Sequence, residues 1–247
     1  MKLHIFHTVN EGLYLWNGRS GLLIDALHGG VSEGFSDMPE KYKRLMLEKK
    51  SFFRKTNDVL FTHLHDDHYD KELVDQFASL YPSSYFYGPG LEKNNVSVVE
   101  SNNKFDYIKM RDYHIYSFNS EHDGKPYAGY PHRSYIIECD DERLWLSGDA
   151  LFSDKLAEDV LDACDGKQID RAFVNVYQIG SRNNLSFLQK VHPKEIYLYH
   201  LPYPEDDRGR YHHLAKGCIS KCARMGIEVK MLQQDSFMDG GQKSEDS

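Results

Sequence analysis

The stretch DVLFTHLHDDHYD, residues 58–70, decides how the rest of the chain is interpreted. Its apolar first part is typical of a buried strand, and four side chains that can bind a metal follow it directly: His63, His65, Asp67 and His68. In an extended backbone, side chains two residues apart share a face, so His63 and His65 can point at one metal. Asp67 and His68 come where the chain turns towards a helix, so they can face a second metal.

The types of side chain in this stretch favour a metal centre over a packing role. Imidazole nitrogens and carboxylate oxygens together suit Zn²⁺, Mn²⁺ or Fe²⁺. The alternative is a solvated loop that happens to hold three histidines, but so many potential ligands in such a short segment rarely have a packing explanation. They also follow the end of a strand, where a site can open to solvent.

Three further candidate ligands each follow a run that is typical of a strand: His122, Asp149 and His200. The run before Asp149, LWLSG at 144–148, is apolar and ends in glycine. A carboxylate beyond such a run has little use in packing. As a bridge between two cations it has one, because it brings them close and offsets their repulsion. The sequence therefore predicts a site for two metals.

The order of these motifs resembles that of the metallo-β-lactamase superfamily: strand-Thr-His-x-His-x-Asp-His, a later His, a strand-Gly-Asp and a final strand-His. The ligand motifs span residues 58–200, and the leading strands with Asp25 fit the first motif of the family. The resemblance thus covers nearly the whole chain. It implies an α/β fold, an αββα sandwich of two mixed β-sheets with helices on the outer faces.

The resemblance also implies a role for each ligand. The first metal would be held by His63, His65 and His122, the second by Asp67, His68 and His200, and Asp149 would bridge them. It implies two divalent metal ions, zinc first, with manganese or iron as alternatives. A hydroxide that bridges the metals would attack a small ester, lactone or phosphoester. Asp67 would be the catalytic residue that orients the hydroxide or takes its proton.

Two positions separate branches of this superfamily. His65 stands where the di-iron flavoprotein branch has Glu, which favours a hydrolytic site. Tyr69-Asp70 stands in place of Gly-Gly, which argues against a glyoxalase II activity. The chain lacks the long insertions of the RNA-processing branches, so it looks most like small bacterial hydrolases, including the lactonase-like ones related to ascorbate-phosphate lactonase. The alternatives are a phosphodiesterase or nuclease on the same fold, a redox di-iron protein, and a metal-binding sensor without turnover.

Four residues outside the ligand set are candidates for binding an anionic group of a small-molecule substrate: His28, His132, Arg133 and Tyr203. His28 lies in the loop after the third predicted strand, and the others lie close in sequence to predicted ligands. For each one the competing interpretation is a surface residue or a support for a ligand, because ligand histidines need acceptors for their second N–H group.

The composition indicates which classes of partner the protein can have. The net charge of −8 argues against nucleic acid, whose phosphates demand a basic face. No apolar run approaches the ~18 residues of a membrane helix. The N-terminus carries His4 and His7 inside its short apolar stretch and does not look like a signal peptide, so we expect a cytoplasmic protein. The four cysteines are scattered and are expected to be buried thiols.

Periodicity predicts one domain over residues 1–233, without a linker, followed by a polar tail at 234–247 that is expected to be disordered. The expected strands are 2–7, 12–16, 20–25, 58–62, 84–88, 96–99, 105–109, 113–119, 134–139, 143–147, 171–176, 195–199 and 227–232. The expected helices lie at 39–50, after the caps Asp70 and Ser153, at 183–191 and at 211–225. Strands with interspersed helices suit a layered α/β fold.

Overall fold

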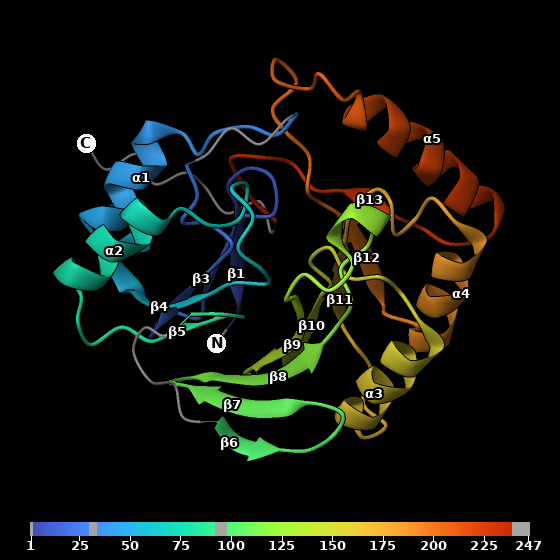
Figure 1. The fold of residues 1–247 in the computed structure, drawn as a ribbon, viewed down its shortest axis with the longest axis horizontal. Coiled ribbons are helices and arrows are strands. Elements are labelled where there is room, and N and C mark those ends of the chain that lie inside the picture. The colour runs from blue at the N-terminus through green and yellow to red at the C-terminus, as the bar shows by residue number, and fades with distance from the viewer. Residues whose placement is uncertain (1, 30–33, 92–97, 239–247) are drawn as a thin grey trace. The chain divides into compact units, whose positions relative to one another are not determined.

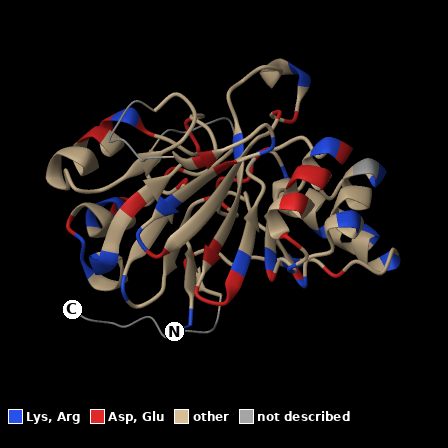
Figure 2. Cartoon of the chain, turned by 90° about the horizontal axis from the view of Figure 1, so that it is seen from below, with Lys and Arg blue, Asp and Glu red and all other residues tan. Residues whose placement is uncertain are grey.

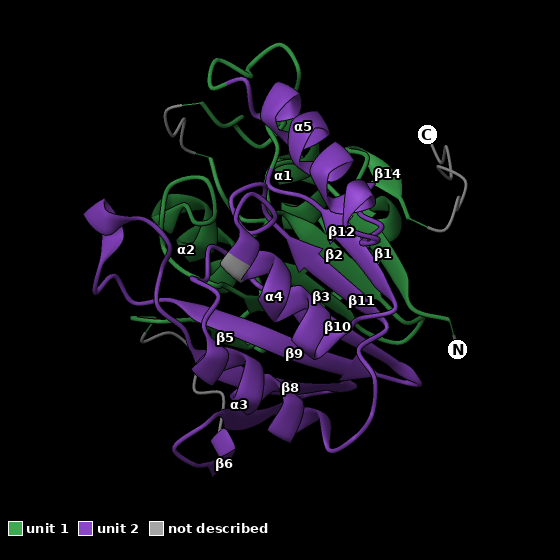
Figure 3. Ribbon diagram, turned by 90° about the vertical axis from the view of Figure 1, so that its right-hand side faces the viewer, with its two compact units in different colours: residues 1–96, 201–209, 232–247 green, residues 97–200, 210–231 purple. Residues whose placement is uncertain are grey.

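A computed structural model of the protein describes residues 2–29, 34–91 and 98–238 (Figure 1). The chain divides into two compact units (Figure 3). Unit 1 consists of Met1–Val96, Leu201–Gly209 and Leu232–Ser247, and unit 2 of Ser97–His200 and Arg210–Met231. Because the last third of the chain alternates between the units, no single linker separates them. One domain over residues 1–233 stays a prediction.

Unit 1 contains a mixed sheet of six strands in the order β14-β1-β2-β3-β4-β5. These strands are β1 (His4–His7), β2 (Leu13–Trp16), β3 (Gly21–Ile24), β4 (Thr56–Leu60), β5 (Phe86–Tyr87) and β14 (Ser236–Phe237). Neighbours from β14 to β3 are antiparallel, whereas β3, β4 and β5 are parallel. The helices α1 (Glu40–Leu47) and α2 (Lys71–Leu80) lie together beside these strands (Figure 1).

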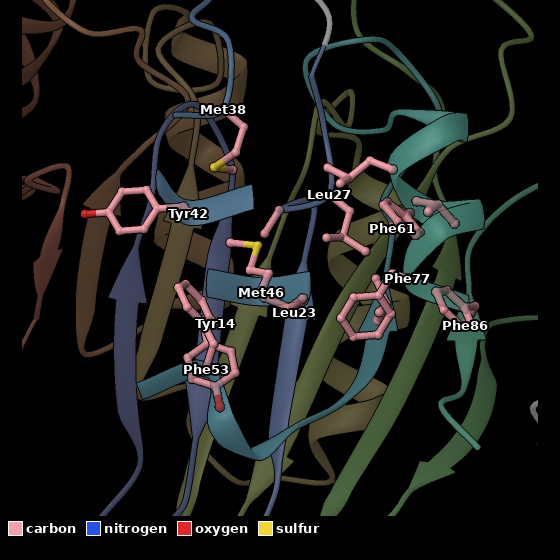
Figure 4. Close-up of a cluster of buried hydrophobic side chains, with 14 of the residues drawn as sticks. Tyr14, Leu23, Leu27, Met38, Tyr42, Met46, Phe53, Phe61, Phe77 and Phe86 are labelled. Carbon is pink, nitrogen blue, oxygen red and sulfur yellow. The ribbon is translucent and has the colours of Figure 1, made fainter. Parts of the chain in front are cut away.

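The core of unit 1 forms where both helices turn their apolar stripes to one face of the sheet (Figure 4). Tyr42 and Met46 of α1 are four residues apart, and both are buried, as the helical repeat requires. Phe77 of α2 contributes in the same way. Phe53 joins them from a 3-10 turn, Ser51–Lys55, that the sequence pattern did not predict.

Unit 2 contains a mixed sheet of eight strands in the order β13-β12-β11-β10-β9-β8-β7-β6. These strands are β6 (Val98–Ser101), β7 (Asp106–Met110), β8 (Tyr113–Asn119), β9 (Arg133–Cys139), β10 (Glu142–Leu146), β11 (Arg171–Val174), β12 (Glu195–Leu198) and β13 (Lys230–Met231). From β6 to β10 the neighbours are antiparallel, and from β10 to β13 they are parallel.

Three helices lie along one side of the strands of unit 2 (Figure 1): α3 (Asp154–Cys164), α4 (Arg182–Val191) and α5 (Tyr211–Arg224). Trp145 of β10 is completely buried. Its ring centroid is 5.7 Å from that of Phe118 on β8 and 6.2 Å from that of Phe187 on α4. These contacts fix α4 on the sheet, and with it the loops at its start.

The parallel strands of this sheet bring residues that are far apart in the sequence to one edge of the sheet. The strands β10, β11 and β12 are in parallel register, so their carboxyl ends meet at one edge, where open α/β sheets commonly bind ligands. Asp149, Asn175 and His200 follow these three strands in turn.

Two expectations for the C-terminal part of the chain are corrected. The expected strand 227–232 is shorter, with only β13 in ladder register beside β12. Residues 234–238 are ordered, since β14 pairs with β1 and the Phe237 ring lies 5.0 Å from that of Phe6; an apolar contact holds a segment whose composition is polar. The rest of the expected tail lies outside the described residues, as do residues 96–97 of the expected strand 96–99.

Positive and negative residues are mixed over the described part of the chain. Lys and Arg positions are interspersed with Asp and Glu positions along helices and strand ends (Figure 2). Among the described residues, no helix has both the length and the apolar character that crossing a membrane requires.

Candidate functional site

The segment of unit 1 that carries the candidate ligands, residues 63–68, is called the ligand segment. It is fixed at its start by Asp25, which directly follows β3. The carboxylate of Asp25 accepts hydrogen bonds from the backbone N–H of Thr62, at 2.8 Å, and from its hydroxyl, at 2.7 Å. Asp25 has a φ of 46°, a left-handed conformation that residues other than glycine rarely adopt and that is common at functional sites. The first motif of the resemblance therefore has a physical role, which is to hold the loop after β4.

The two histidines predicted to share a metal do face each other. Nε2 of His63 lies 3.0 Å from Nδ1 of His65, and the hydroxyl of Thr62 lies 3.1 Å from Nδ1 of His63. The two imidazole nitrogens that point at each other are the two that a common cation would use. Their placement confirms, within unit 1, that side chains two apart share a face.

His68 lies among carboxylates. Its Nδ1 is 3.3 Å from Oδ2 of Asp25 and 3.6 Å from Oε2 of Glu11, and its Nε2 is 3.7 Å from Oδ2 of Asp67. Burial lowers the pKa of His68, but Asp67, Glu11 and Asp25 outweigh burial and raise it to about 9. Carboxylates behind one ring nitrogen orient a histidine so that the other nitrogen can bind a metal.

Unit 2 brings its three predicted ligands together on its own. Oδ1 of Asp149 is 3.1 Å from Nδ1 of His200, and Oδ2 of Asp149 is 3.5 Å from Nε2 of His122. Each carboxylate oxygen thus faces a different imidazole. His200 also has a left-handed backbone, with a φ of 58°, so that a strained residue stands at the end of the strand.

Neighbouring groups hold two of these predicted ligands, His122 and Asp149, in place. Nδ1 of His122 donates to the backbone carbonyl of Asp123 at 2.6 Å, which leaves Nε2 directed at Asp149. The side-chain amide of Asn175 donates to Oδ1 of Asp149 at 2.6 Å. Nε2 of His132 accepts a hydrogen bond from the backbone N–H of Asp149 at 2.9 Å.

The four residues predicted to bind substrate differ in their surroundings. His28 is completely buried in the loop after β3. Both ring nitrogens of His132 are engaged, Nε2 as above and Nδ1 with the Ser120 hydroxyl at 2.8 Å, so His132 supports a ligand. Arg133 pairs with Asp106 at 2.8 Å. Tyr203 donates to Asp235 at 2.8 Å, and burial, then Asp235, raises the pKa of its phenol.

Sequence reasoning missed Glu11 and Asn175. Glu11 is completely buried in the turn between β1 and β2, and Asn175 follows β11. For Asn175 a signal was present, because a polar residue follows an apolar run there just as Asp149 does. A single glutamate in a turn beside Asn10 and Gly12 gives no comparable signal, since most such residues are solvated.

No protein-family model matches the chain, and no curated protein matches its sequence. Solved structures do match. The isothiocyanate hydrolase from Delia radicum gut bacteria has a TM-score of 0.63 and 14% identity, with 95% of this chain and 98% of that chain covered. The metallo-β-lactamase fold protein YhfI from Bacillus subtilis has a TM-score of 0.63 and 11% identity, with 95% and 98% covered.

CmlA, a di-iron β-hydroxylase from Streptomyces venezuelae, also matches, with a TM-score of 0.56 and 12% identity. There the match covers 96% of this chain and 54% of the other. The chain therefore has the metallo-β-lactamase fold, with two mixed sheets flanked by helices. The predicted fold class is confirmed.

Proposed function

We propose that the protein is a metal-dependent hydrolase that holds two divalent cations. One cation would be held by His63, His65 and His122, the other by Asp67, His68 and His200, with Asp149 bridging. The ligands fit such a centre by their chemistry, because imidazole and carboxylate groups suit zinc, manganese or iron.

The observation that carries this proposal is the position of Asp149. Its two carboxylate oxygens face two different histidines, at 3.1 and 3.5 Å, while the Asn175 amide and the His132 ring fix its orientation. A carboxylate held in this way can serve two cations at once. A role in packing alone would not need one imidazole on each oxygen.

When bound, the cations would lower the pKa of a coordinated water towards 7 and polarise the scissile group. The residues of the chain supply the rest. Asp67 is buried beside His68, and it would take the proton of the attacking water and pass it to the leaving group. Asp25 and Glu11 would keep His68 in one orientation throughout.

The proposed substrate is a small ester, lactone or phosphoester. The fold is shared with a protein named as an isothiocyanate hydrolase, and the net charge of −8 does not suit a long nucleic acid. A phosphodiesterase acting on a small phosphodiester uses the same ligands, so only substrate assays separate it from an esterase or lactonase. We further propose that the protein is cytoplasmic.

The test is elemental analysis of the purified protein and of Asp149→Ala, followed by assays with lactone, carboxylic ester and phosphodiester substrates. We expect two ions per chain in the wild type and fewer than one in Asp149→Ala. The Asp149→Ala variant should also lose most of its hydrolytic activity. Asp141→Ala, at the exposed turn between β9 and β10, is the control and should keep both. A variant Asp149→Ala with full activity and no metal would overturn the proposal.

A redox di-iron protein is the second candidate, favoured by the fold shared with CmlA. It predicts two iron ions per chain and a visible absorption band that changes on reduction. The hydrolase predicts turnover with zinc alone. His65 in place of Glu supports the hydrolase.

A further inference from the structure

A groove of about 510 Å³ lies within unit 2, between the start of α4 and the helix α5. Its apolar lining comes from the loop after β10, the loop after β11 and α5, through Leu151, Phe152, Val176, Tyr177, Leu214 and Cys218. We call it the α4–α5 groove. Its volume falls within the range of roughly 300–1,000 Å³ that is usual for small-molecule pockets.

The groove is lined by three exposed apolar side chains and by one buried aromatic ring. Leu151, Tyr177 and Leu214 are 37%, 51% and 42% exposed, which places three of the exposed large apolar side chains in one concave surface. Phe152 is buried and stacks on Phe187 with 4.0 Å between ring centroids. An apolar surface that is concave, exposed and rigid is typical of a binding site.

The groove shares two of its loops with His122 and Asp149, the candidate ligands of unit 2. Asp123, at its rim, follows His122 in the chain, and Leu151 comes two residues after Asp149. The two loops are tied together, because the backbone N–H of Asp123 donates to the carbonyl of Asp149 at 2.7 Å. The loops that carry His122 and Asp149 therefore also supply Asp123 and Leu151 to the lining of the groove.

Charge decides what kind of group fits. Among the described residues that line the groove, Asp123 is the only charged one, and none is Lys, Arg or His. A carboxylate or phosphate would face Asp123, and Lys221, beside the groove, already donates to the carbonyl of Gly180 at 2.8 Å. An alkyl chain would instead cover Leu151, Tyr177 and Leu214.

We propose that the α4–α5 groove binds an unbranched alkyl group of the substrate, attached to the bond that is hydrolysed. The substrate is then a neutral ester or lactone with an apolar chain. This inference rests on the proposed function, and it replaces the expected anionic group with an apolar one. Leu214, on α5, determines how long a chain the groove accepts.

The first experiment measures binding of alkyl hydroxamates to the zinc-loaded protein by calorimetry, from acetohydroxamate to octanohydroxamate. The hydroxamate binds zinc whatever reaction the enzyme performs. We expect the Kd to fall roughly threefold per added methylene. Leu214→Trp, which fills the groove, should abolish this dependence and leave acetohydroxamate binding unchanged.

Met225→Trp is the control, because Met225 caps the opposite end of α5, does not line the groove, and is 42% exposed, as Leu214 is. It should keep the dependence on chain length. A Kd that does not change with chain length would overturn the inference. So would a dependence that survives in Leu214→Trp, since the chain would then lie elsewhere.

The second experiment needs no metal. Metal-free protein with ¹³C-labelled leucine methyl groups is titrated with 1-octanol, and the methyl shifts of Leu151 and Leu214 should move. Those of Leu161, which is 37% exposed on α3, should not. Absence of a shift at Leu214 would overturn the groove. Octanol shifts without any hydroxamate binding would support the groove and contradict the proposed metal centre.

Discussion

Glu11 belongs to a buried acidic cluster around His68. Glu11, Asp25 and Asp67 are 0%, 1% and 4% exposed, and all three approach His68. Burying a carboxylate costs several kcal/mol unless a positive charge compensates it. One imidazole supplies at most one positive charge for three negative ones. The proposed cation beside His68 would add positive charge to this cluster.

We predict that Glu11→Gln weakens the affinity for zinc by roughly 10- to 100-fold. Glutamine has the same shape but lacks the charge that orients Nδ1 of His68, which lies 3.6 Å away. Competition with a chelating dye measures the affinity. Glu40→Gln, at the exposed start of α1, is the control. An unchanged zinc affinity in Glu11→Gln would show that the carboxylate does not act on the centre.

His7 predicts a dependence of stability on pH that is independent of the metal ligands. Nε2 and Nδ1 of His7 lie 3.0 and 3.2 Å from the carbonyl oxygens of Asn10 and Gln233. Burial lowers the pKa of His7 below 6.5, and these carbonyl groups only partly oppose it. Below pH 6.5 the unfolded chain therefore binds the proton more readily than the folded protein does.

The folded state should accordingly lose stability as the pH falls below 6.5, by up to about 1.4 kcal/mol per pH unit from this group. Above that pH the contribution is complete. Urea unfolding of the wild type and of His7→Gln at pH 7.5 and 5.5 checks this, and the wild type should lose more stability than the variant. Equal losses would mean that His7 does not carry the effect.

The residues that could be predicted from the sequence are those without another explanation. His63, His65 and Asp149 follow apolar strands as candidate metal donors, and packing does not need them there. Glu11 could not be predicted, because it becomes informative only when folding places it beside His68, distant in sequence. Arg133 could be misjudged, since its partner Asp106 comes from a strand two places away in the sheet.

At the scale of elements, the helix α2 is a direct continuation of the ligand segment. The side chain of Asp70 accepts from the backbone N–H of Leu73 at 2.8 Å and so caps the helix. Its own backbone N–H donates to the carbonyl of Leu27 at 2.8 Å. Asp70 thus fixes the position at which the chain leaves His68.

We predict that Asp70→Ala lowers the free energy of unfolding by about 1 kcal/mol, the usual cost of losing an N-cap, and also weakens zinc binding. Ser153→Ala is the matched control, because Ser153 caps α3 in the same way. It should cost about as much stability and leave zinc binding unchanged. Equal zinc affinities in the two variants would contradict a link between α2 and the ligands.

Most elements follow from periodicity because their apolar faces are continuous. The exceptions are those that tertiary contacts create. The 3-10 turn Ser51–Lys55 exists because Phe53 enters the core of unit 1, and β14 exists because Phe237 packs beside Phe6. Neither segment has a periodic pattern of its own, so no reading of local sequence could have predicted it.

At the scale of the whole molecule, the donors are divided between the two units. Unit 1 supplies four of the seven predicted ligands, and unit 2 supplies the three that meet at Asp149. Neither unit alone offers the proposed first set, since His63 and His65 belong to unit 1 and His122 to unit 2. The proposed function therefore requires that His65 and His122 bind the same cation.

A double-mutant cycle tests this requirement directly. If His65 and His122 bind one cation, His65→Ala should lower the affinity for that cation. The loss should exceed the roughly 10- to 100-fold that removal of a supporting partner costs. His122→Ala should then add far less in the double variant than it does alone, because the ion it would have lost is already gone. The non-additivity should correspond to roughly 0.5–3 kcal/mol. Zinc titration of the four proteins measures it.

The control cycle pairs His65→Ala with His213→Ala, an exposed residue of α5 that is not a predicted ligand. Its effects should add, because residues without a shared partner act independently. Additive effects in the His65 and His122 cycle as well would mean that each unit binds its metal separately. The hydrolytic centre would then lose its basis, since a water shared by two cations needs ligands from both units around one pair of ions.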